Sequence, residues 1–96
     1  MTNRTEKIRH LLQETLAPTH IEIYDDSQSH AGHAGARSGG GHFYATIVAE
    51  AFAGQTLVRR HQAVYAALAE MMQSDIHALS IKAYTPDEFA QLEKQD

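Results

Sequence analysis

Histidine is the residue type on which the chemistry of this chain depends. The 96 residues include seven histidines and no cysteine, so imidazoles are its strongest nitrogen ligands and the groups that titrate nearest neutral pH. The lack of cysteine excludes disulfides, thiolate metal sites and a Cys nucleophile. His30 and His33 lie three apart in DDSQSHAGHAGARSGGGHF, a segment that holds five of the six glycines. This spacing is a weak metal signal by itself, because stray histidines are common in loops.

A further histidine, His77, begins an alternating segment that follows the polar turn Gln73-Ser74-Asp75. The alternation over residues 76–84 predicts a strand with His77, Leu79 and Ile81 on one face. A side chain at the end of so short a strand keeps one edge of its ring exposed, which is the geometry that a metal ligand needs. The three histidines form a site only if the fold brings the glycine-rich loop to His77.

The other four histidines have simpler explanations. His10 and His20 stand among polar neighbours and are expected to be solvated, and His42 is expected to make an ordinary hydrogen bond where a strand begins. His61 falls on the inward stripe of a helix, which favours a buried imidazole with partners for both ring nitrogens. None of these four is a first candidate for binding a metal.

A second candidate site is the helix start that contains Arg59 and Arg60. Cations in the first turn of a helix oppose the positive end of its dipole by about 0.3–1 kcal/mol each. The stretch from Gly54 to Arg60 therefore gathers positive potential and unpaired backbone amides, which suits an anion. Two solvated arginines explain the same pattern equally well, so both interpretations stay open.

The composition limits the class of protein. Eight Lys and Arg against twelve Asp and Glu give a formal charge of −4, which argues against a general affinity for nucleic acid or acidic membranes. The length predicts one domain over residues 1–96 with a single modest core and is too small for two domains, so a multi-step enzyme is not the first expectation. No apolar run approaches the roughly 20 residues of a membrane span, and MTNRTEKIRH lacks the apolar core of a signal peptide. We expect a soluble, cytoplasmic protein with no membrane partner.

Periodicity predicts the elements that must position these side chains. In chain order they are a helix at about 3–16, strands at about 19–25 and 42–52, a helix at about 56–73, a strand at 76–84 and a last helix from Thr85. The inward stripe predicted for the long helix is Leu57, His61, Val64, Leu68 and Met71. The Gly/His-rich segment at about 27–41 is expected to be a flexible loop. Thr85-Pro86-Asp87-Glu88 combines a cap, an early proline and a capping-box glutamate, so it predicts a sharp helix start.

The order of these elements predicts an α+β fold, in which helices pack on one face of a three-stranded sheet. The strand at 42–52 has apolar residues on both faces, with Phe43 and Ile47 on one and Tyr44 and Val48 on the other. Such a strand is expected to be central in the sheet.

Five pieces of the sequence, in order, resemble those of BolA proteins. They are Asp25-Asp26-Ser27-x-x-His30, His42-Phe43, Phe52-x-Gly54, Arg60-His61-x-x-Val64-Tyr65 and Ile76-His77-Ala78-Leu79. The pieces cover nearly the whole chain, and their combination is specific although each is weak alone. The resemblance implies a class II KH-like fold of order αββ(α)αβα, whose additional short helix corresponds to the turn from Gly54 to Val58.

The resemblance also implies a function and a ligand set. BolA proteins pair with monothiol glutaredoxins and share a [2Fe–2S] cluster, for which the partner side supplies the glutaredoxin cysteine and a glutathione thiol. The BolA side supplies a histidine of the third strand, which matches His77, and a loop residue, which matches His30. His33 is the alternative loop ligand. Two imidazoles on one iron would raise the potential above that of an all-thiolate cluster, and protonation would compete with the metal.

A non-enzymatic adaptor in cluster trafficking, iron homeostasis or redox regulation is therefore the expected function. No cofactor is expected in the isolated protein, because clamping a glycine-rich loop costs about 1–2 kcal/mol of backbone entropy per residue. We expect the chain alone to be a monomer or a weak dimer.

One alternative is a nucleic-acid-binding regulator of transcription that uses Gly54, Arg59, Arg60 and His61 to bind DNA. The small basic patch at the helix start favours it. The net charge opposes it, and Phe52-Ala53-Gly54-Gln55 lacks the GXXG loop by which KH domains clamp a backbone.

Another alternative is a histidine-based enzyme or a zinc site. Zinc held by His30, His33 and His77 with an open fourth position is feasible, although it would be expected only as an artefact of purification. Hydrolysis would need a histidine paired with a carboxylate and an oxyanion hole in a pocket. The nearby aspartates, Asp26 and Asp75 among them, are candidates by residue type only.

Overall fold

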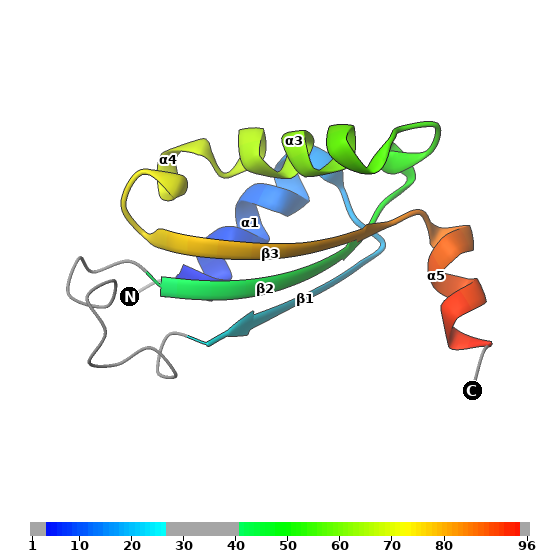
Figure 1. The fold of residues 1–96 in the computed structure, drawn as a ribbon, viewed down its shortest axis with the longest axis horizontal. Coiled ribbons are helices and arrows are strands. Elements are labelled where there is room, and N and C mark those ends of the chain that lie inside the picture. Colours follow the sequence, from blue (N-terminus) through cyan, green and yellow to red (C-terminus); the bar gives the residue numbers. More distant parts are fainter. Residues whose placement is uncertain (1–3, 27–40, 95–96) are drawn as a thin grey trace.

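The computed structural model describes residues 4–26 and 41–94, which form a mixed three-stranded sheet with helices (Figure 1). The elements are α1 (Arg4–Leu16), β1 (His20–Asp25), β2 (Gly41–Val48), the 3-10 helix η2 (Glu50–Phe52), α3 (Leu57–Ala67), α4 (Ala69–Met72), β3 (Ile76–Tyr84) and α5 (Pro86–Glu93). The predicted α+β class and order of elements are confirmed. The predicted loop at about 27–41 lies almost entirely outside the described residues.

The sheet has the strand order β1-β2-β3, so the prediction that β2 is central is confirmed. β2 runs antiparallel to β1 and parallel to β3. The starts of β2 and β3 therefore lie beside the end of β1, and we call this the loop end of the sheet. At the opposite end His20, Val48 and Tyr84 stand side by side, and we call this the α5 end.

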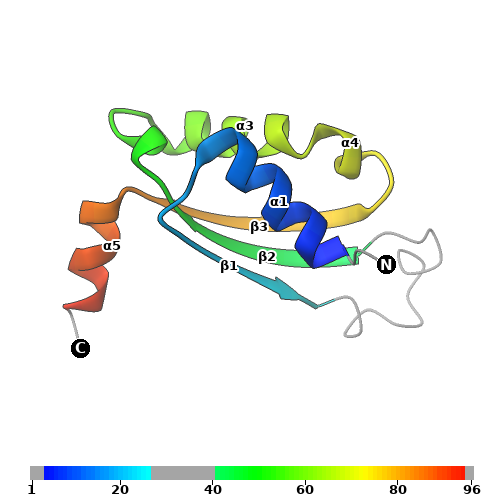
Figure 2. The same ribbon diagram turned by 180° about the vertical axis from the view of Figure 1, so that it is seen from behind.

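Helices α1, α3 and α4 cover one face of the sheet (Figures 1 and 2). The core between these layers is built from Ile8, Leu12, Phe43, Ala45, Ile47, Ala49, Phe52, Val64, Leu68, Met71, Ile76 and Ala83. The contribution of α1, Ile8 and Leu12, has the four-residue spacing of one helix face. Among the described residues, no helix is long and apolar enough to cross a membrane.

The end of α1 is made by a residue in the left-handed conformation. Ala17 has a φ of 47°, and its N–H donates to the carbonyl of Gln13 at 3.2 Å. This is the position that helices most often give to glycine, since a Cβ is strained there. Pro18 follows and prevents the helix from continuing.

The segment after β2 differs from the prediction in two details. β2 ends at Val48 rather than Phe52, because the chain turns into η2 over Glu50–Phe52. That helical turn precedes the place, Gly54 to Val58, where the additional short helix was expected. Gly54 itself has a φ of 76°, a conformation that the absence of a Cβ permits.

The predicted long helix is in fact two helices. Thr56 caps α3 as expected, its hydroxyl accepting from the N–H of Arg59 at 3.2 Å, but α3 ends at Ala67 and α4 begins at Ala69. The break is at Leu68, whose φ of −107° and ψ of 17° are not helical. The first part of the predicted stripe is also wrong.

The stripe that faces the sheet is Arg60, Val64, Leu68 and Met71. Leu57, which was expected to point inward, is 65% exposed, and His61 is half-buried rather than part of the core. The stripe begins at Arg60 rather than at Leu57 because the charge of a buried Arg60 is paired with Glu88 on α5.

The last helix lies off the end of the sheet rather than over its covered face (Figure 1). The predicted capping box is confirmed: the N–H of Glu88 donates to Thr85 Oγ1 at 3.2 Å, and the N–H of Thr85 donates to Glu88 Oε1 at 2.9 Å. Within α5 no residue is fully buried, and its main apolar contact is through Phe89.

Candidate functional site

A β-bulge presents His77 at the loop end of the sheet. Gly41 pairs with Ile76 and His42 pairs with Ala78, so β3 has one residue more than β2 at this point. His77 is that extra residue, and it has no counterpart on β2. Bulges often re-aim a side chain at the rim of a sheet.

The bulge corrects the predicted faces of this strand. Strict alternation would place His77 with Leu79 on the covered face and Ile76 on the other. In the structure Ile76 is 3% exposed and lies in the core, whereas His77 is exposed. Because one residue is inserted between them, Ile76 and Leu79 both turn inward and the imidazole faces solvent.

Neighbouring groups fix the start of β3. The side chain of Asp75 lies 3.9 Å from Arg4 Nε and 3.5 Å from Lys7 Nζ on α1. Its carbonyl accepts from the N–H of Gly41 at 3.0 Å. The backbone two residues before His77 thus contacts both α1 and β2.

The two loop histidines, His30 and His33, lie outside the described residues. Over residues 4–26 and 41–94, no group of three or more His, Asp or Glu side chains is placed to hold a metal ion. An exposed imidazole is a suitable donor for iron or zinc, but His77 can fill only one coordination position. Any metal bound there would need further ligands from residues 27–40 or from another chain.

Aromatic rings cluster on the uncovered face of the sheet, next to the row in which His42 pairs with Ala78, the residue after His77. The ring of His42 stacks on Tyr44 with centroids 5.0 Å apart, and Tyr24 lies 6.1 Å from Tyr44 across the β1–β2 pair. Both tyrosines are well exposed, at 61% for Tyr24 and 43% for Tyr44. The sequence patterns did not predict this cluster, because the position of Tyr24 opposite Tyr44 depends on the register of β1 against β2.

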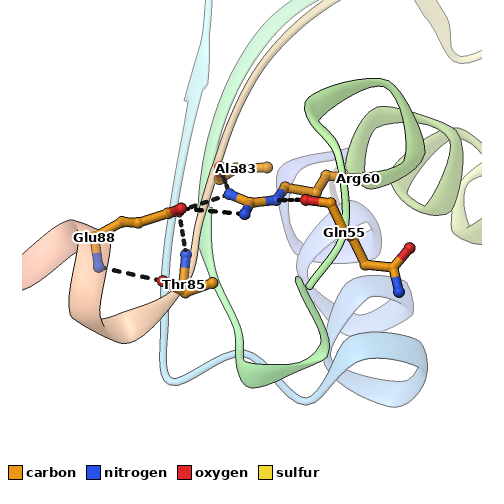
Figure 3. Close-up of polar contacts among 5 residues, drawn as sticks. All are labelled: Gln55, Arg60, Ala83, Thr85 and Glu88. Atoms are coloured by element: carbon orange, nitrogen blue, oxygen red, sulfur yellow. Dashed lines mark hydrogen bonds and ion pairs between the residues drawn. The ribbon is translucent and has the colours of Figure 1, made fainter. Parts of the chain in front are cut away.

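The second candidate site, at the start of α3, is arranged differently. Arg60 is 7% exposed, and its guanidinium binds Glu88 through two hydrogen bonds, from Nη1 to Oε1 at 2.6 Å and from Nη2 to Oε2 at 3.1 Å (Figure 3). Nε donates to the carbonyl of Gln55 at 3.0 Å, and Nη1 donates to that of Ala83 at 3.1 Å. Arg60 therefore joins α3, β3 and α5.

The ion pair between Arg60 and Glu88 shifts the pKa values of both groups. Hydrogen bonds from Arg60, and then from the N–H of Thr85, lower the pKa of Glu88 from 4.5 to about 2, although partial burial opposes the shift. The hydrogen bond to Glu88 raises the pKa of Arg60. Of the residues proposed here for nucleic acid, Arg59 and Gly54 have exposed positions, whereas the charge of Arg60 is neutralised within the fold.

Other predicted groups make local contacts. His10 lies 3.0 Å from Glu14 on α1. His20 was expected to be solvated, but it lies 2.6 Å from Glu22 and stacks on Phe89 with centroids 5.0 Å apart. The contacts found for Asp75 are with cations rather than with a histidine, so they do not make the carboxylate–histidine pair that hydrolysis would use.

The comparisons with known proteins agree with this architecture. A family model described as BolA-like protein matches residues 12–88. SufE-like protein 1, chloroplastic/mitochondrial, of Arabidopsis thaliana is 43% identical, covering 90% of this chain and 24% of that protein. Protein BOLA1, chloroplastic, of the same plant is 43% identical, covering 90% of this chain and 56% of that protein. The chain thus spans about a quarter and just over half of these two relatives.

A bacterial relative and two solved structures extend the comparison. DNA-binding transcriptional regulator BolA of Escherichia coli is 33% identical, covering 92% of this chain and 81% of that protein. The structure of BolA1 from Arabidopsis thaliana is similar with a TM-score of 0.80 and 42% identity, covering 92% of this chain and 97% of that one. The BolA domain of SufE1 from the same plant gives 0.78 and 41%, covering 92% and 98%.

Proposed function

Because this chain belongs to the BolA family, we propose that it is a non-enzymatic adaptor that shares a [2Fe–2S] cluster with a monothiol glutaredoxin and glutathione. The observation that carries the proposal is the position of His77, exposed on a bulge two residues after Asp75, which contacts α1 and β2. An exposed imidazole at the rim of the sheet, on a strand that is paired with β2, can act as a ligand to a cluster brought by another chain.

The donor set is suited to a shared site rather than to one that this chain completes alone. His77 supplies one imidazole, and the second comes from His30, or from His33 in its place. A cluster held by imidazoles on one iron and thiolates on the other has a higher reduction potential than one held by thiolates alone. This chain has no cysteine, so the thiolates must come from the partner and from glutathione.

Mixing the protein with a cluster-loaded monothiol glutaredoxin tests the proposal. We expect a heterodimer and a changed visible circular dichroism spectrum, because replacing a cluster ligand changes the electronic environment of the irons. His77→Ala is expected to remove the change, and His30→Ala and His33→Ala, made separately, assign the loop ligand. His10→Ala, an exposed histidine on α1, serves as the control. If all three ligand variants gave the wild-type spectrum, imidazole ligation by this chain would be wrong.

A nucleic-acid-binding role is the second candidate, and one observation favours it: a relative that is 33% identical carries the name DNA-binding transcriptional regulator. The exposed Arg59 beside the start of α3 would contact phosphate, whereas Arg60 is already paired with Glu88. A salt titration of binding to duplex and single-stranded DNA measures the number of phosphate contacts from its slope. A shallow slope with weak affinity, unchanged in Arg59→Ala, would count against this role.

A further inference from the structure

The uncovered face of the sheet consists of rows of side chains that point away from the helices. From the α5 end to the loop end, the rows are His20–Val48–Tyr84, Glu22–Thr46–Lys82, Tyr24–Tyr44–Ser80 and His42–Ala78. The two ends of this face contain similar aromatic residues. They differ in whether a helix of the same chain covers them.

At the α5 end, the apolar surface is covered by an anchor residue from α5. The ring of Phe89 lies 5.0 Å from that of His20 and 6.0 Å from that of Tyr84, the two neighbours of Val48 in the sheet. Val48 is 2% exposed although it belongs to the uncovered face. In this row Phe89 packs against both neighbours of Val48, and Val48 is buried between them.

Toward the loop end the corresponding rings, Tyr24 and Tyr44, are exposed. None of the described helices lies on this part of the uncovered face (Figure 1). A groove of about 290 Å³ adjoins Tyr44, lined by Tyr44, Ala45, Thr46, Ser80, Ile81 and Lys82. Lys82 is exposed at its edge and forms no ion pair with any residue in 4–26 or 41–94. Exposed aromatic rings beside a cation are typical of protein interfaces, where Tyr is enriched.

Two features indicate what would cover this surface. It is continuous with the loop end, where His77 is exposed, so a chain that shares a cluster with His77 must approach the same rim of the sheet. The positive charge of Lys82 would be complemented by a carboxylate on the incoming chain. The groove would accommodate an apolar or aromatic side chain, as Phe89 is accommodated at the α5 end.

We propose that Tyr24, Tyr44 and Lys82, which we call the tyrosine surface, form the docking site for the thiol-bearing chain that shares the cluster. That chain would place an apolar or aromatic side chain in the groove beside a carboxylate that pairs with Lys82. This inference rests on the proposed function and specifies where the partner binds apart from the cluster itself. Docking here contributes affinity even when no cluster is present.

Binding of a clusterless, glutathione-loaded monothiol glutaredoxin, measured by calorimetry, tests the inference. Tyr24→Ala and Tyr44→Ala are each expected to weaken binding about tenfold, the effect of removing an aromatic contact at the centre of an interface. Lys82→Glu is expected to weaken it several-fold, with the loss reduced at high salt. All three side chains are exposed, and far-UV circular dichroism checks that the variants are folded.

Tyr65→Ala is the matched control, because Tyr65 is 40% exposed, close to the 43% of Tyr44, but lies on α3 over the other face of the sheet. It is expected to bind within twofold of wild type. If Tyr24→Ala, Tyr44→Ala and Lys82→Glu all bound within twofold of wild type, the tyrosine surface would not be the docking site.

Other outcomes separate this inference from the function on which it rests. If the wild type took up no cluster from the loaded partner, the proposed function would fail and the inference with it. If His77→Ala lost the cluster spectrum while the tyrosine variants bound normally, only the docking surface would be wrong. Two further results would overturn it: Tyr44→Ala weakening only the binding of a thymidine oligonucleotide, or abolishing only self-association in sedimentation equilibrium.

Discussion

At the α5 end of the sheet, the cation Arg60 is buried against Glu88 and the aromatic Phe89 packs against His20 and Tyr84. From the second row of the uncovered face toward the loop end, the cation Lys82, the aromatic Tyr44 and the imidazole of His77 are all exposed. The two ends use similar residue types, but at one end the polar and apolar groups find partners within the fold. At the other end they remain accessible.

The difference between the two ends suggests that the α5 end contributes mainly to stability and the loop end mainly to binding. Buried, paired groups contribute to the free energy of folding, because separating them leaves an uncompensated charge or an exposed apolar row. Exposed groups contribute little to folding and are available for contacts with other molecules. Substitutions at the α5 end should therefore change stability, whereas those at the loop end should change binding.

The largest expected effect is that of Arg60→Ala. Removing the guanidinium breaks its hydrogen bonds to Glu88, Gln55 and Ala83, and we expect a loss of about 3 kcal/mol in the free energy of unfolding. Arg59→Ala removes the neighbouring exposed arginine and should change stability by less than about 0.5 kcal/mol. Urea denaturation of both variants measures the contrast. Equal losses would mean that the Arg60 network does not hold α5 in place.

The pH dependence of stability should reveal the same ion pair. A pKa lowered from 4.5 to about 2 means that Glu88 contributes stability above about pH 4.5, which is lost as the pH falls toward 2. The shift corresponds to at most about 3.4 kcal/mol, and solvent screening should reduce it to about 1.5 kcal/mol because the Glu88 side chain is 47% exposed.

Glu88→Gln should therefore be less stable than wild type at pH 6, and the gap should close between pH 4.5 and 2. Glu93→Gln, an exposed position on the same helix, should follow the wild-type curve. Thermal unfolding at a series of pH values gives both comparisons. A constant gap down to pH 2 would show that the charge of Glu88 is not what stabilises this end.

Phe89→Ala tests the apolar part of the α5 end. The ring is only half-buried, so we expect a loss of about 1 kcal/mol rather than the roughly 3–5 kcal/mol of a fully enclosed phenylalanine. Leu92→Ala, also on α5 but 43% exposed, should cost clearly less. Chemical denaturation distinguishes the two, and a larger loss for Leu92→Ala would mean that Phe89 is not the anchor.

The smallest expected effect on stability belongs to deletion of His77. Because His77 is the bulged residue, its removal restores a regular ladder in which Ile76 and Leu79 still face the core, at a cost of about 0.5 kcal/mol. Deletion of Ser80 instead reverses the faces on one side of the deletion and should unfold the protein. Circular dichroism and denaturation compare the two deletions, and similar damage from both would contradict the bulge.

Much of the fold could be predicted because its signals are local. Periodicity located the first helix, predicted at about 3–16 and found over Arg4–Leu16, and the apolar character of both faces of β2 identified it as the central strand. The capping box of Thr85 and Glu88 is present as predicted. In each case the residues that specify the element are within a few positions of one another.

The predictions of which side chains face the core were wrong at two places. In one, a partner distant in the sequence decides the orientation, and in the other a single inserted residue does. Arg60 turns inward because Glu88 lies 28 residues further along the chain, which no local pattern reveals. The bulge had a signal that strict alternation overlooked: Ile76 and Leu79 are both apolar but have opposite parity. For the site, His77 is exposed as a ligand requires, while the roles of His30 and His33 remain predictions.

The attachment of α1 through Arg4 and Lys7 to Asp75 also determines where further protein could be joined to this domain. That contact brings the beginning of the domain close to the rim that carries His77, whereas α5 leads away beyond the opposite rim (Figures 1 and 2). A fluorescent protein or immobilisation tag fused after α5 would leave the loop end of the sheet, with His77, accessible. The same fusion placed ahead of α1 would crowd it.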